Sequence, residues 1–222
     1  MPPLSRPFPR FIADSAQEVR PYGRWQERLG ETFAEACAAL ADEASTTADL
    51  KAARFFPERT WGGRTYVPVV APGADEVDGV APEFFGHVSF LREPDGEPGE
   101  MTPTADFTDV TAAANPDWEV DLNDDVVGKW RADGARGGDV TLIWGTPLVR
   151  GALAVTAELD GEVLDQAAVN EGRFTLLAVD AVHGFGDDLF LEIKLWNRRL
   201  QQIASESLYL EEGAEDEEEA GG

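Results

Sequence analysis

The stretch "ALAVTAELDGEVLDQ" (residues 152–166) indicates the fold more clearly than any other part of the chain. In its first half every second residue from Leu153 onward is apolar, which is the period of a strand that buries one face. Asp160 and Gly161 then form a two-residue turn signal, and the residues after them resume a strand-like pattern. We therefore expect an antiparallel β-hairpin here.

Segments of the same character lie on both sides of this hairpin. They are short and rich in aromatic and β-branched residues, and neither a helical period nor a βαβ alternation separates those of the C-terminal half. The segments are 64–70, 83–91, 139–145, 173–179, 188–196 and 202–210. The sequence predicts a mainly β fold: an antiparallel β-sandwich, immunoglobulin-like or jelly-roll-like, with one N-terminal amphipathic helix.

The helix is predicted from a stripe of apolar residues near the N-terminus. Trp25, Leu29, Phe33, Cys37 and Leu40 recur at spacings of three and four, so they share one helix face. An isolated helix of this length is only marginally stable, so we expect this face to pack on the sandwich or on another chain. Cys37 is expected to be a small core residue, because nothing on this helix would activate a thiol.

The chain divides into three regions by composition. Residues 1–23 are rich in proline and are expected to form an extended arm. Residues 24–212 are expected to form one mainly β domain, with a helix and short strands at 24–93, a linker or long loop at 94–103, and the sandwich at 104–212. Residues 213–222 belong to an acidic tail that is expected to be disordered.

The charge of the chain limits its partners. Asp and Glu number 43 and Lys and Arg 18, which gives a formal charge of −25. Such a field repels phosphate backbones and anionic lipid surfaces, so we expect neither nucleic acid nor membrane as a partner. The basic residues are mostly arginine, which fits two interpretations: a coding bias, or a surface adapted to a salt-loaded cytoplasm.

A soluble, cytoplasmic protein is expected from the remaining global features. No apolar stretch has the length of a membrane span, and the first residues lack the apolar core of a secretion signal. Cys37 is the single cysteine and cannot form an internal disulfide, which suits a reducing compartment.

Metal-binding residues are sparse. Two histidines, His87 and His183, and one cysteine are too few for a structural zinc site. His87 lies in an apolar segment and is expected to be a hydrogen-bonded core residue.

Calcium, which oxygen atoms alone can bind, has two weak candidate sites. The candidate ligands are Asp121, Asn123, Asp124 and Asp125 in "DLNDD", and Asp187 and Asp188 in "HGFGDD". Neither run has the spacing of an EF-hand, and clustered Asp with nearby Gly is also typical of a turn. We therefore expect both runs to be turns and expect no cofactor.

Four tryptophans in the C-terminal half are candidates for ligand binding: Trp118, Trp130, Trp144 and Trp196. An exposed indole stacks well on a sugar ring, whereas a buried one would close an end of the sandwich. No nucleophile elbow and no phosphate-binding loop is present. A pair of carboxylates across a cleft stays open as a catalytic arrangement, since sequence does not reveal separation in space.

The function expected from these observations is a non-enzymatic binding or structural role, such as a subunit of an assembly, with a protein partner or self-association. The alternative is a carbohydrate-active sandwich, either a calcium-supported binding module or a carboxylate-pair glycoside hydrolase. A cleft that holds two carboxylates and an accessible tryptophan would favour the alternative.

Overall fold

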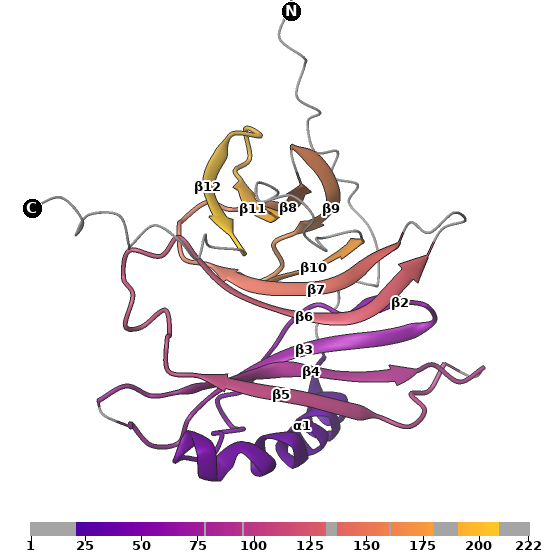
Figure 1. Ribbon diagram of the computed structural model, residues 1–222, viewed down its shortest axis with the longest axis vertical. Coiled ribbons are helices and arrows are strands. Elements are labelled where there is room, and N and C mark those ends of the chain that lie inside the picture. Colours follow the sequence, from indigo (N-terminus) through magenta and orange to yellow (C-terminus); the bar gives the residue numbers. More distant parts are fainter. Residues whose placement is uncertain are drawn as a thin grey trace, which may run out of the picture.

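The protein is a stack of one helix and three antiparallel sheets. The computed structural model describes residues 21–77, 79–94, 96–131, 137–159, 161–179 and 191–208. Helix α1 (Gly23–Ala44) lies at one end of the long axis, and the sheets follow it in the order of the chain (Figure 1). We call them sheets 1, 2 and 3.

Sheet 1 carries the helix on one face. Its strands are β1 (Arg54–Phe55), β2 (Arg59–Trp61), β3 (Arg64–Pro72), β4 (Glu83–Leu91) and β5 (Thr102–Thr108). Strands β1, β3, β4 and β5 are neighbours in that order, and β2 pairs with β3. Leu29 and Phe33 of the helix are fully buried against apolar side chains such as Val69 and Phe84. The predicted apolar stripe therefore packs on this sheet.

The helix ends at Ala44. Ser45 follows its last residue in the left-handed region, with φ of 55°, which is the conformation that commonly ends a helix. The next residue, Thr46, accepts a hydrogen bond from the amide of Asp75, so the chain leaves the helix toward the loop before β4.

Sheet 2 is buried on both faces. It contains β6 (Val120–Arg131), β7 (Gly137–Pro147) and β10 (Phe174–Val179), in the order β10–β7–β6. Leu142 and Trp144 of β7 pack on Tyr66 and Val70 of sheet 1. Ile143, between them in sequence, faces the opposite way. For this reason all five residues in the middle of β7, 140–144, have no exposed surface, and four of them are apolar.

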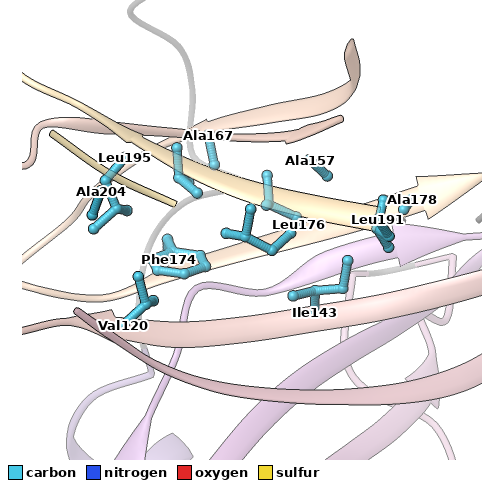
Figure 2. Packing of buried hydrophobic residues seen from close by; sticks show 12 residues of the cluster. Val120, Ile143, Ala157, Ala167, Phe174, Leu176, Ala178, Leu191, Leu195 and Ala204 are labelled. Carbon is cyan, nitrogen blue, oxygen red and sulfur yellow. The ribbon is translucent and has the colours of Figure 1, made fainter. Parts of the chain in front are cut away.

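Sheet 3 closes the other end of the stack. It contains β8 (Ala154–Leu159), β9 (Glu162–Ala168), β11 (Leu191–Trp196) and β12 (Gln202–Ser207), in the order β12–β11–β8–β9. Figure 2 shows Ile143, Phe174 and Leu176 of sheet 2 packed among Leu191 and Leu195 of sheet 3. This cluster joins sheets 2 and 3.

The structure confirms the mainly β, antiparallel fold with one helix near the N-terminus. The predicted hairpin is also confirmed, since Leu159 of β8 pairs with Glu162 of β9. The described strands divide into three sheets, however, where an immunoglobulin-like or jelly-roll sandwich has two.

Residues 92–101 connect two strands that pair with each other, β4 and β5, so this segment is the loop of a hairpin. Most of the predicted arm and the whole acidic tail lie outside the described residues. Within those residues, no helix is long and apolar enough to cross a membrane.

Candidate functional site

A groove opens where the edge of sheet 1 faces the edge of sheet 2. Strand β5 is the outer strand of sheet 1, and β6 is the outer strand of sheet 2 (Figure 1). Two adjoining hollows lie between them, an inner one of about 140 Å³ and an outer one of about 450 Å³. They share Phe85, Asp106 and Asp124, so we treat them as one groove.

Segments far apart in the sequence build the groove. The inner hollow is lined by Phe85, Gly86, Thr104, Ala105, Asp106, Asp124, Asp125 and Trp144. The outer hollow is lined by Glu83, Phe85, Asp106, Thr108, Val110, Trp118, Asp121, Leu122, Asn123 and Asp124. A glycine is required at position 86, because a Cβ there would overlap the carbonyl of Thr104 on the neighbouring strand.

Two carboxylates of the outer hollow share one arginine. Nη2 of Arg54 lies 2.7 Å from Oε2 of Glu83 and 3.8 Å from Oδ2 of Asp121. Burial and the charge of Asp121 raise the pKa of Glu83 to about 7, although Arg54 opposes the shift. Burial also raises the pKa of Asp121. The single positive charge of Arg54 therefore offsets only part of the cost of burying two negative charges.

A histidine and a tyrosine fasten β6 to sheet 1. Nδ1 of His87 lies 3.2 Å from Oδ2 of Asp125, at a geometry too poor for a good hydrogen bond. The hydroxyl of Tyr66 donates to the carbonyl of Val127 over 3.2 Å. His87 is buried, as expected, but its Nδ1 makes no good hydrogen bond, and its contact is with a residue of another sheet at the inner end of the groove.

The four candidate calcium ligands of "DLNDD" lie in the first half of β6, so the prediction of a turn is wrong for this run. Successive residues of a strand alternate between its faces, which separates Asp124 from Asp121, Asn123 and Asp125. Asp124 borders the groove at the exposed edge of β6, where partial desolvation and the charge of Asp125 raise its pKa.

No group of three or more His, Cys, Asp or Glu side chains within the described ranges is arranged to hold a metal ion. The second candidate run, with Asp187, Asp188 and the nearby His183, lies outside those ranges.

The four candidate tryptophans do not form one platform. Trp118 is half-buried and lines the outer hollow, and Trp144, with no exposed surface, lines the inner one. Trp130 lies toward the other end of β6, and Trp196 is buried on sheet 3. The structure thus brings two of the four to the groove.

The indole N–H of Trp144 is a buried donor without a hydrogen-bond partner. Leaving such a group unsatisfied costs about 1–3 kcal/mol, and each case in a folded protein needs an explanation. Trp196 offers a contrast, because its Nε1 donates to Oγ1 of Thr156 over 2.9 Å.

A second buried polar cluster lies on sheet 3. Nζ of Lys194 lies 2.8 Å from Oε2 of Glu158, which also accepts a hydrogen bond from Thr156 through Oε1. These residues alternate with Val155, Ala157 and the other apolar residues that face sheet 2, so they occupy the opposite face. The cluster is a buried ion pair.

Sequence reasoning found the β6 carboxylates and Trp118 but missed Glu83 and Asp106. Glu83 is the first residue of β4, and Asp106 is an exposed polar residue in an alternating strand, which is an ordinary pattern. Only the pairing of Phe85 with Asp106 and the stacking of two sheet edges bring them together.

Comparisons with models of protein families, with curated proteins and with solved structures find no match to this chain.

Proposed function

We propose that this protein is a non-enzymatic binding protein and that the groove between sheets 1 and 2 is its binding site. The observation that carries the proposal is the excess of carboxylate in a concave site. Glu83, Asp106, Asp121 and Asp124 line the groove, and Arg54 contacts only the first and third of them among the described ion pairs. A ligand that donates hydrogen bonds would relieve the cost of burying these acids.

Two classes of ligand supply such donors. One is a basic segment of a partner protein, which the charge of −25 would attract over long distances. The other is a sugar chain, whose hydroxyls donate to carboxylates and whose rings stack on an indole such as Trp118. The same charge weighs against nucleic acid and anionic membranes.

Carboxylate-pair glycoside hydrolysis is the second candidate. Glu83 with its pKa of about 7 has the property of a general acid, and Asp121 lies beside it in the hollow that Trp118 lines. The direct contact between Arg54 and Glu83 argues against hydrolysis, because the guanidinium engages the carboxylate that would have to deliver the proton. The geometry therefore favours binding.

The test is a binding screen by calorimetry with neutral hexasaccharides of glucose, mannose and N-acetylglucosamine and with hexalysine. We expect at least one to bind with a Kd below about 1 mM, and the double variant Asp106→Asn/Asp124→Asn to weaken binding at least about tenfold. The matched control, Asp42→Asn/Asp75→Asn, makes the same charge change at exposed positions away from the groove and should bind as the unaltered protein does.

Equal weakening in both double variants would place binding outside the groove and contradict the proposal, as would a failure of every ligand to bind. Release of reducing ends from a hexasaccharide, abolished in Glu83→Gln, would instead support the hydrolase.

A further inference from the structure

The inner hollow is the part of the groove whose chemistry is most restrictive. Its polar lining residues are Asp106, Asp124, Asp125 and Thr104, and Trp144 lines it as well. Ionised carboxylates only accept hydrogen bonds, and an indole N–H only donates.

Trp144 gives an observation independent of the acids. It has no exposed surface, it lines the hollow, and its Nε1 has no hydrogen-bond partner. The hollow therefore combines several carboxylate residues with a buried donor that has no acceptor.

Few ligand groups satisfy both demands. An ammonium or guanidinium group donates to the carboxylates but has nothing to accept the indole hydrogen. A phosphate or carboxylate accepts from the indole but is repelled by the acids. A hydroxyl group or a neutral amide both donates and accepts, and neither carries a charge whose desolvation must be compensated. Of the two, the hydroxyl of a sugar also brings a ring that can stack on Trp118 in the adjoining hollow.

We propose that the ligand of the groove is a neutral carbohydrate chain, with one hydroxyl in the inner hollow between the carboxylate of Asp125 and the N–H of Trp144. This inference rests on the proposed function and names its ligand class. The outer hollow, about 450 Å³, then takes the adjoining ring beside Trp118. Because Trp144 is fully buried, its indole is reached only when the wall of the hollow shifts, and ligand binding should change tryptophan fluorescence.

The decisive variant is Trp144→Phe, which keeps an aromatic ring but removes the N–H. Against the neutral hexasaccharide that binds best, calorimetry should give an affinity about tenfold lower than that of the unaltered protein. Trp196→Phe is the matched control: it removes an N–H that already has a partner, on a different sheet, and should leave the affinity unchanged. Thermal melts of both variants establish that each is folded under the conditions of the titration.

Salt separates the two ligand classes. Binding of a neutral sugar should change less than about twofold between 0.1 and 1 M NaCl, whereas binding of hexalysine would weaken steeply over that range.

Three results would overturn the inference. Hexalysine binding that is lost in Asp106→Asn/Asp124→Asn, with no hexasaccharide binding, would sustain the groove as the site but contradict its ligand class. Sugar binding that is equally strong in Trp144→Phe would contradict the hydroxyl subsite. Binding of neither probe would remove both the inference and the proposed function, leaving a hollow that holds water only.

Discussion

Glu83 is the residue at which the groove should affect stability. Its pKa rises from 4.5 to about 7 on folding, mainly through burial and then through Asp121. At a pH between these two pKa values, Glu83 keeps its proton in the folded protein but has released it in the unfolded chain. The free energy of unfolding should therefore fall as pH rises through this window, by on the order of 3 kcal/mol from this group, and then level off.

The variant Glu83→Gln should lose this decrease and should be more stable than the unaltered protein at pH 8. Urea unfolding at pH 5 and at pH 8 measures both effects. Glu76→Gln, at an exposed position before β4, is the control and should retain the decrease. An unchanged pH dependence in Glu83→Gln would mean that the raised pKa belongs to another group.

The same residue illustrates what sequence could not predict at this scale. "DLNDD" is conspicuous because its acids are adjacent, whereas Glu83 and Asp106 are 23 positions apart and ordinary in their local context. Their proximity follows from the register of β4 and β5, in which Glu83 pairs with Thr108 and Phe85 with Asp106. A register is set by turns and by packing, and neither could be located from the acids themselves.

At the level of elements, the clearest expectation concerns the helix. Phe33 is fully buried between α1 and sheet 1, so Phe33→Ala should lower the free energy of unfolding by about 3–4 kcal/mol. Glu31→Ala, exposed on the same helix, should change it by less than about 0.5 kcal/mol. Denaturant unfolding followed by circular dichroism gives both values. A loss below about 1 kcal/mol for Phe33→Ala would show that α1 contributes little to the fold.

Elements were predictable from sequence where their pattern is periodic. The spacing of Leu29, Phe33 and Cys37 predicts α1, and the alternation before Gly161 predicts the β8–β9 hairpin, because each pattern records a single buried face. The strand character of "DLNDD" was missed because polar residues favour turns. These residues lie on an edge strand and line a groove, so they need no apolar pattern.

The arrangement of the whole molecule was less predictable. Strand β10 pairs with β7, across the intervening β8–β9 hairpin, and so joins a different sheet from its neighbours in sequence. The near-continuous apolar run of β7 indicates that both its faces are buried, which is the one signal for a middle layer. The partner of each face depends on contacts between distant segments.

A prediction at this scale concerns the charge of −25. Like charges repel most in the compact state, and the screening length falls from about 30 Å at 0.01 M salt to about 3 Å at 1 M. Raising NaCl from 0.01 to 1 M should therefore increase the free energy of unfolding by about 1 kcal/mol or more. Choline chloride at equal ionic strength should act similarly. Stability independent of both salts would mean that the acids are already compensated by their neighbours.

The order of the layers also has a consequence for synthesis on the ribosome. Helix α1 and sheet 1 are complete at Thr108, but the face that carries Tyr66 and Val70 is covered only when β7 ends at Pro147. At roughly 5–20 residues per second, the growing chain presents this bare apolar face for roughly 2–8 s. During that interval the first half of the molecule resembles a client of the chaperones that shield nascent chains, and crowding of neighbouring ribosomes would favour its aggregation.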